Sequence, residues 1–317
     1  MNTHSAGLQL VTLIAMAVLL AIAPMESAAR EISSSHDQEE GVFRVERDGE
    51  NVFQYRSAPN PYKPYVEYFA TPGGLNVLRD APPDHPHHHG LMFAITVNGV
   101  NFWEEHDAPG RQAPLNTYET VQALHDDFSE SSYSQALEWL PPDADTPALT
   151  ESRTVTLRLS EDADAPSMLT WTSALTAPED AEPAVLEGLH YHGLGARFLE
   201  VMDEGGSFVS PVDDEPEHVR GGEYLLRAPW QAYTAEVNGA PVTFAMFCRP
   251  DNPRHPAWWF IMDGPFAYLS ATLRLHEDPL TLEPGETLEL VYGVALWDGA
   301  QDEETIAEAY EAWLAER

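Results

Sequence analysis

The sequence predicts an all-β protein, a large antiparallel β-sandwich that ends in one amphipathic helix. Three observations support this prediction. Short runs of alternating apolar and polar residues recur along the chain, with the period of a strand that buries one face. Turn dipeptides such as Asp48-Gly49, Asn98-Gly99 and Asn238-Gly239 separate these runs. Helical spacing is convincing only at the end of the chain.

The N-terminal segment predicts export. Leu8–Ala23 is apolar, has about the length of a signal sequence and is short for a membrane-spanning helix. We therefore expect residues 1–29 to be a signal peptide and the mature protein to be secreted or periplasmic, with an uncleaved membrane anchor as the alternative. Residues 30–41 are polar and acidic and predict a disordered leader. We expect residues 42–317 to form a single β-sandwich domain, similar to a supersandwich.

Eighteen runs after this leader have the composition and length of strands. In chain order they are Val42–Arg47, Val52–Arg56, Tyr65–Ala70, Leu75–Leu78, Leu91–Val97, Val100–Trp103, Tyr118–Leu124, Gln135–Leu140, Arg153–Leu159, Met168–Leu175, Val185–His192, Ala196–Val201, Glu223–Leu226, Gln231–Val237, Val242–Cys248, Trp258–Met262, Tyr268–Leu275 and Glu286–Ala295. The helix is predicted over Asp302–Arg317, where apolar side chains recur at helical spacing and acidic residues begin the segment.

The charge of the chain narrows the classes of partner. Fifty-two acidic residues face sixteen basic ones, for a net charge of −36. A field of this sign repels nucleic acid and anionic membrane surfaces, so neither is expected as a partner. The composition is typical of a protein from a high-salt habitat, where a solvated acidic surface maintains solubility. Cys248 is the only cysteine, which excludes an intramolecular disulfide.

A histidine-rich stretch precedes the hairpin at Asn98-Gly99. Asp84, His85, His87, His88 and His89 fall within six residues. If the following strand sets the alternation, His88 shares a face with small residues and looks into an open cleft. We therefore predict that His88 is catalytic. Imidazoles at His85 and His87 suit a divalent metal such as zinc or copper, although a role in hydrogen bonding to the backbone or to substrate is the alternative.

A second candidate group lies in the run from Glu187 to Arg197. His190 and His192 are two residues apart and would share a face of a strand, beside glycines that permit close approach of a ligand. We predict His192 as a second catalytic histidine, Glu187 as the catalytic carboxylate, and His190 as a substrate-binding residue; a hydrogen-bonded, half-buried structural pair is the alternative for the two histidines. Arg197 is one of few basic residues and is expected to orient a carboxylate or a hydroxyl-rich ligand.

A third group is the polar loop that contains Arg254 and His255, both predicted to bind substrate, with a role in stiffening the loop as the alternative. Trp103 is predicted to stack on the apolar face of a sugar ring. All three groups are expected to converge on one hollow in the sheet.

Four motifs resemble a known family. DHPHHHGLMFAITVNGVNFW, HGLGARF, FCRPDNPRHPAWW and GETLELVYGVALWDG are similar to secreted bacterial proteins of unknown function commonly labelled methane oxygenase PmoA-like. The likeness extends from Tyr65 to Asp298, and the family usually has arginine where His89 stands, which favours His87 and His88. The resemblance implies a galactose-mutarotase-like supersandwich and an association with bacterial polysaccharide breakdown. In mutarotase-like folds, histidines and a carboxylate on the concave sheet act on a sugar.

These observations predict a secreted carbohydrate-active enzyme with a glycan or modified sugar as substrate; hydrolase, lyase and epimerase chemistry all remain open. One alternative is a non-catalytic sugar-binding module that uses tryptophans as platforms. Another is a copper-dependent oxygenase, as the family label suggests, although a membrane methane oxygenase subunit would need many apolar spans.

Overall fold

The computed structural model describes residues 30–58 and 62–316, and the predicted signal peptide lies outside these residues. It confirms an all-β fold of antiparallel sheets followed by a single helix. Within the described residues, no helix is long and apolar enough to cross a membrane.

The largest sheet has ten strands, and its strand order brings distant parts of the chain together. The order is β1 (Ile32–Asp37), β2 (Val42–Arg47), β3 (Glu50–Arg56), β4 (Tyr65–Phe69), β5 (Leu91–Ala94), β13 (Gly193–Arg197), β20 (Tyr268–Thr272), β19 (Ala257–Met262), β16 (Glu223–Ala228) and β15 (Glu217–Arg220). Because β13 inserts between β5 and β20, the segment near His192 lies beside the segment that follows the histidine-rich stretch.

The second sheet has eight strands and packs against the first. Its order is β14 (Ser207–Val209), β17 (Trp230–Val237), β18 (Ala240–Cys248), β22 (Thr287–Asp298), β11 (Ser167–Thr176), β10 (Leu149–Ser160), β9 (Phe128–Leu140) and β8 (Arg111–Leu124). A small four-stranded sheet has the order β21 (Leu280–Leu282), β12 (Ala184–Glu187), β6 (Thr96–Val97) and β7 (Val100–Asn101). A short 3₁₀ helix, η1, spans Glu200–Met202.

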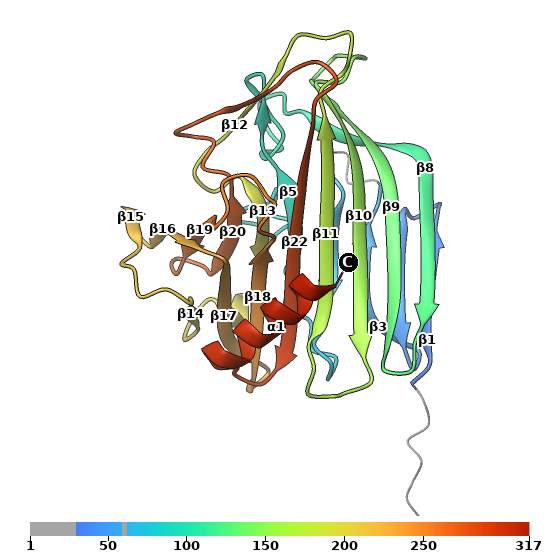
Figure 1. The fold of residues 1–317 in the computed structure, drawn as a ribbon, viewed down its shortest axis with the longest axis vertical. Coiled ribbons are helices and arrows are strands. Elements are labelled where there is room, and N and C mark those ends of the chain that lie inside the picture. Colours follow the sequence, from blue (N-terminus) through green and yellow to red (C-terminus); the bar gives the residue numbers. More distant parts are fainter. Residues whose placement is uncertain (1–29, 59–61, 317) are drawn as a thin grey trace, which may run out of the picture.

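The main core lies between the two large sheets. Trp171, Phe244 and Trp259 are fully buried within it. The helix α1 (Glu303–Ala315) covers the outer face of the eight-stranded sheet, in front of β22 (Figure 1). Its residues Tyr310 and Trp313 form a second, smaller core with Phe247. The site described below therefore lies away from the helix, on the ten-stranded sheet.

Several sequence predictions about local structure were wrong. The expected strand Val185–His192 ends at Glu187, so His190 and His192 lie outside it, and the expected strand Ala196–Val201 is replaced by β13, which ends at Arg197, and by η1. The expected disordered leader contains β1, because Ile32–Asp37 pairs along its whole length with β2. The run Leu75–Leu78 forms no strand and makes only isolated bridges, through Asn76 and Leu78.

The turn predictions were correct in detail. Asp48-Gly49, Asn98-Gly99 and Asn238-Gly239 each have positive φ at both residues, between 50° and 80°. This is the backbone that a tight two-residue hairpin requires, and it explains why asparagine or aspartate precedes glycine there.

Candidate active site

A cavity of about 190 Å³ opens on the ten-stranded sheet beside the histidine-rich loop. Its walls combine imidazoles, carboxylates and aromatic rings. The lining residues are His85, His87, His88, Trp103, Glu104, Tyr191, Arg220, Glu223, Phe260, Met262, Phe266 and Tyr268.

Strand pairing explains why residues so far apart in sequence meet here. Tyr268 on β20 is paired with Met262 on β19 and with Arg197 on β13. Met262 is in turn paired with Glu223 on β16. Directly paired residues project from the same face of a sheet, so one face of four neighbouring strands carries these side chains. The loop at residues 81–90 and the turn at Trp103 complete the cavity.

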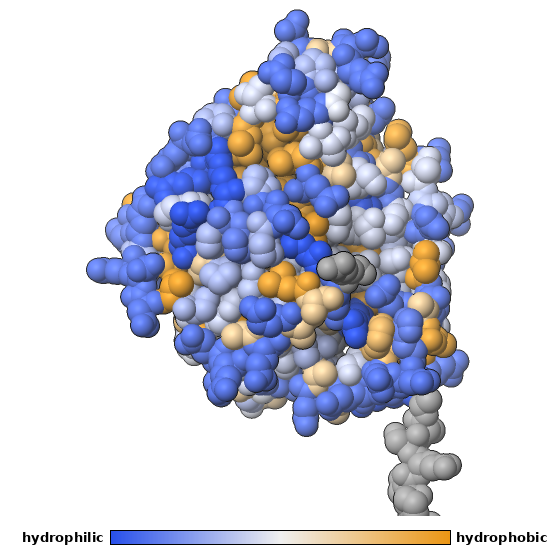
Figure 2. All heavy atoms as spheres, in the orientation of Figure 1, coloured by the Kyte–Doolittle hydropathy of each residue, from blue (hydrophilic) through white to orange (hydrophobic). Residues whose placement is uncertain are grey.

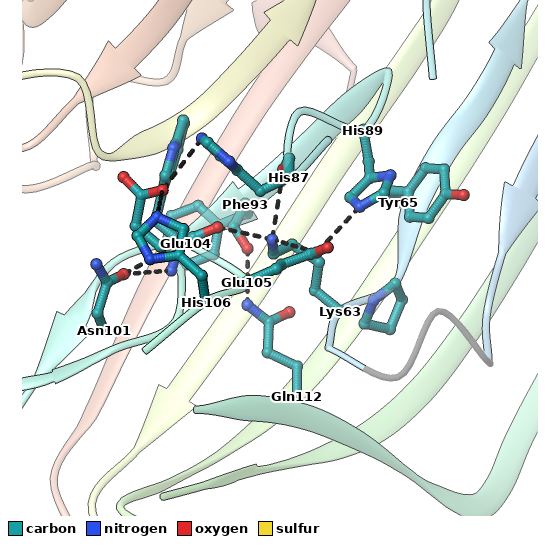
Figure 3. A network of polar contacts seen from close by, with 12 residues as sticks. Lys63, Tyr65, His87, His89, Phe93, Asn101, Glu104, Glu105, His106 and Gln112 are labelled. Carbon is teal, nitrogen blue, oxygen red and sulfur yellow. Dashed lines mark hydrogen bonds and ion pairs between the residues drawn. The ribbon is translucent and has the colours of Figure 1, made fainter. Parts of the chain in front are cut away.

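A buried network of charged residues holds the loop at residues 81–90 against the turn at Trp103 (Figure 3). The Lys63 ammonium donates to the Trp103 carbonyl oxygen and to a Glu105 carboxylate oxygen, each at 2.8 Å. The Nε2 of His89 lies 3.0 Å from the same carboxylate oxygen of Glu105, and its Nδ1 lies 2.6 Å from Asp80. Burial lowers the pKa of His89, but hydrogen bonds to Asp80 and Glu105 outweigh it, so the pKa is raised overall.

Glu104 presents its carboxylate to the cavity with weak internal partners. The Nε2 atoms of His87 and His106 each lie 3.2 Å from its Oε2, and the Tyr191 hydroxyl donates to its Oε1 at 3.4 Å. Burial, and then the charge of Glu104, raises the pKa of Tyr191 to about 12, so its hydroxyl keeps its proton. Burial lowers the pKa of His87 against the opposing effect of Glu104. Glu104 is therefore an acceptor within reach of a ligand.

Glu223, at the start of β16, provides a second carboxylate to the cavity lining. It accepts from the Nε of Arg220 at 2.9 Å and lies 2.8 Å from the Nε2 of His190. Burial raises the pKa of Glu223, yet the hydrogen bonds from Arg220 and His190 lower it overall. Glu223 is therefore ionised at neutral pH.

His88 and His192 are buried imidazoles that stay neutral. Burial strongly lowers the pKa of His88, and neighbouring cations add to this effect. Burial lowers the pKa of His192 to about 3. His192 stacks on Trp103, with ring centres 5.1 Å apart and planes 10° from parallel. A neutral imidazole has one donor and one acceptor, so each ring can both give and take a hydrogen bond.

Unpaired polar atoms gather at the base of this cavity, on His88, Trp103 and Tyr268, and behind its lining, on His192 and Arg197. Sixteen buried side-chain nitrogen and oxygen atoms of the described residues have no hydrogen-bond partner, and seven of them belong to this one cluster. They are Nδ1 of His88, Nε1 of Trp103, both ring nitrogens of His192, Nε and Nη1 of Arg197, and the hydroxyl oxygen of Tyr268. Each such group costs about 1–3 kcal/mol. Their concentration in one place indicates a site built to bind a polar ligand.

The structure brings most of the predicted site residues together. His85, His87, His88 and Trp103 line the cavity. Behind them, His190 holds Glu223 and His192 supports Trp103. Arg197 is fully buried beneath Phe266, with its guanidinium 3.5 Å from the ring centre. Its Nη2 donates to Asp84 at 3.3 Å.

Three predicted residues do not belong to the cavity. Glu187 accepts a hydrogen bond from the Gly99 backbone at 3.0 Å and so stabilises the hairpin turn. Arg254 donates to the Leu273 carbonyl oxygen and to Asp278. His255 lies in the same loop, where its carbonyl oxygen accepts from Arg227. Their polarity serves local structure, and none of the three lines the cavity.

Several lining residues were missed by the sequence prediction. Glu104 directly follows Trp103, and its position at the end of the hairpin was a usable signal. Glu223, Phe260 and Tyr268 gave no local signal, because only the strand order brings them to the histidine loop.

The predicted metal site at His85 and His87 finds no support in the side-chain arrangement. In residues 30–58 and 62–316, no group of three or more histidine, cysteine, aspartate or glutamate side chains is placed to hold a metal ion. His85 and His87 have ring centres 5.8 Å apart in an edge-to-face arrangement. His85 instead lies 3.0 Å from Asp84 through its Nδ1, and His87 lies close to Glu104.

Comparison with known proteins identifies the family. A family described as "Family of unknown function (DUF6807)" matches residues 43–311. The chain belongs to this family. That description does not carry the methane oxygenase label suggested by the sequence motifs. No curated protein matches the chain.

Distant likenesses to solved structures also exist. The galactosidase domain of the alpha-galactosidase-sucrose kinase AgaSK has a TM-score of 0.45 at 9% identity, over 84% of this chain and 42% of that one. An alpha-galactosidase from Lactobacillus brevis has a TM-score of 0.44 at 8% identity, over 86% and 40%. A galactose mutarotase-like protein from Clostridium acetobutylicum has a TM-score of 0.39 at 10% identity, over 85% and 99%. The chain thus spans less than half the length of the two galactosidase chains, and a likeness this distant carries no information about activity.

Proposed function

We propose that the protein is a carbohydrate-active enzyme that binds one sugar residue in this cavity and acts on it by proton transfer. The observation that carries the proposal is the cluster of seven unpaired polar atoms in and directly behind the aromatic lining of the cavity. A sugar ring has an apolar C–H face and a hydroxyl-rich edge, so it suits a site of this composition. The volume of about 190 Å³ suits a single sugar residue.

Glu104 is the proposed base. Its carboxylate lines the cavity, and its contacts with His87, His106 and Tyr191 are all 3.2 Å or longer. These contacts hold the carboxylate in place and leave it lone pairs for a substrate proton.

His88 is the proposed donor to the oxygen on which charge develops. Its ring lines the cavity and stays neutral because burial lowers its pKa. The N–H of a neutral imidazole can donate a hydrogen bond to a developing oxyanion. This hydrogen bond stabilises the negative charge on the oxygen. Proton transfer from the sugar to Glu104, with a hydrogen bond from His88 to the charged oxygen, is a step that isomerisation, elimination and hydrolysis can each use. The product of the reaction identifies which of the three takes place.

The test is a turnover assay on a panel of monosaccharides and plant and marine glycans, with the products read by NMR. We expect wild-type protein to convert at least one sugar. Glu104→Gln and His88→Ala should each lower the rate by about 10²- to 10⁴-fold, the usual contribution of a positioned acid or base.

His125→Ala is the matched control, because this exposed histidine does not line the cavity and stacks on Phe128. Its rate should equal that of the wild type. Full activity in both Glu104→Gln and His88→Ala would contradict the proposal. Sugar binding without any turnover would indicate a non-catalytic binding protein instead.

A further inference from the structure

The unpaired atoms at the base of the cavity also indicate the class of sugar, on the assumption that the proposed sugar site is correct. We propose that the substrate residue carries an anionic oxygen group, a carboxylate or a sulfate, that binds at the base of the cavity against Trp103 and Tyr268, with the charge of Arg197 behind Phe266.

Hydrogen-bond polarity is the first argument. Three of the unpaired atoms belong to residues that line the cavity. Nε1 of Trp103 can only donate, while Nδ1 of His88 and the hydroxyl oxygen of Tyr268 can donate or accept. None of the three is an atom that can only accept. A sugar hydroxyl brings a hydrogen of its own that needs an acceptor, whereas a carboxylate or sulfate brings acceptors alone.

The charge at the base is the second argument. Arg197 is fully buried, and among the described residues only its Nη2 has a hydrogen-bond partner, a contact of 3.3 Å to Asp84, while the charge of Asp203 acts on it from nearby. The side chain of Asp84 is 47% exposed, so this partner belongs to the solvent-facing loop. The ring of Phe266, which lines the cavity, lies against the guanidinium, with the charge 3.5 Å from its ring centre. Positive charge behind the cavity lining favours an anion in the cavity.

Hydrogen-bond acceptors at the rim of the cavity are the third argument. Glu104 and Glu223 present carboxylates, which accept hydrogen bonds and repel anions. A sugar with its anionic group at the base would place its hydroxyl hydrogens toward these carboxylates. Donors at the base and acceptors at the rim therefore select an acidic sugar and fix its orientation.

Matched sugar pairs test the inference by isothermal titration calorimetry. The carboxylate arm compares glucuronate with glucose, galacturonate with galactose and mannuronate with mannose. The sulfate arm compares galactose 6-sulfate and glucose 6-sulfate with their neutral parents. The titrations are run at about 1 M NaCl, where the Debye length of about 3 Å suppresses long-range repulsion by the acidic surface. We expect at least one acidic sugar to bind tenfold or more tightly than its neutral partner, and the arm in which this occurs identifies the group.

Two variants show whether the base of the cavity causes the preference. Arg197→Met removes the charge and should reduce the preference to threefold or less while neutral sugars still bind. Tyr268→Phe removes one donor with little change of volume and should reduce the preference several-fold even if Arg197→Met fails to fold, which thermal unfolding would reveal. Neutral sugars that bind as tightly as every acidic partner would overturn this inference and leave the proposed function intact. Absence of binding in both arms would contradict the proposed function itself.

Discussion

At the scale of single residues, the site depends on imidazoles that burial keeps neutral. His88 and His192 lie next to Trp103, and both have lowered pKa values. The opposite holds for His89, whose pKa is raised between Asp80 and Glu105. Histidines close together in the structure thus have opposite charge preferences, set by the presence or absence of carboxylate partners.

Replacement of His192 by phenylalanine should change the pH dependence of stability. The pKa of His192 is about 3 in the folded protein and about 6.5 when unfolded. Below pH 6.5 the His192 side chain therefore binds a proton in the unfolded chain but not in the folded protein. The free energy of unfolding falls by about 1.4 kcal/mol per pH unit as the pH is lowered toward 3. Between pH 6.5 and pH 5, the free energy of unfolding of His192→Phe should fall by about 2 kcal/mol less than that of the wild type, as measured by urea unfolding. Parallel profiles for the two proteins would show that His192 is protonated in the folded state.

Residue-level sequence prediction located the part of the cavity lining that is local in sequence. His85, His87, His88 and Trp103 were predicted and line the cavity, because one loop and its hairpin carry all four. The predicted carboxylate Glu187 does not line the cavity, because its side chain accepts a hydrogen bond from the Gly99 backbone. In a chain with 52 acidic residues, composition alone could not separate Glu104 and Glu223 from the others.

At the scale of elements, β13 is the strand that assembles the site, because it joins the half-sheet that carries the histidine loop to the half-sheet that carries Tyr268. It pairs with β5 on one side and with β20 on the other. Gly195 leaves room for the Tyr268 hydroxyl, since a Cβ at this position would lie 2.1 Å from that oxygen. The sequence could predict these strands from alternation and turns, but it could not predict their order, which depends on pairing between distant segments.

Gly193→Ala tests the importance of this strand. Gly193 has a φ of +151°, and a Cβ there would lie 2.0 Å from the Ala271 carbonyl oxygen of β20. The backbone of a paired strand cannot yield easily, so we expect a loss of about 3 kcal/mol or more in the free energy of unfolding. Gly239→Ala is the control, since its φ is +79° with nothing within 4 Å, and it should lose only about 1–2 kcal/mol. Equal losses in the two variants would show that the close approach of β13 to β20 is unimportant.

At the scale of the whole molecule, the dominant feature is the net charge of −36. Hydrophilic residues cover most of the face that carries α1 (Figure 2). The charge could be predicted from composition, and its destabilising effect is self-repulsion of the folded state. The arrangement of the two sheets could be predicted only as a class, because the sequence does not specify which strands form which sheet.

Salt should stabilise the folded protein. Between about 0.1 M and 1 M NaCl the Debye length falls from about 10 Å to about 3 Å, which screens repulsion among surface carboxylates. We expect the thermal unfolding midpoint to rise on the order of 5 °C over this range, in scanning calorimetry. Sucrose at matched osmolality is the control for solvent exclusion and should give a smaller rise. A midpoint that does not change with NaCl would contradict an effect of surface charge.

The central claim is that the cavity beside His88 binds the sugar on which the enzyme acts. The most direct test is a crystal structure of Glu104→Gln soaked with the sugar that the wild type converts. We predict electron density for one sugar residue against Trp103 and Tyr268, with a sugar oxygen within hydrogen-bond distance of His88. Sugar density at another surface, with the cavity free of ligand, would contradict the claim.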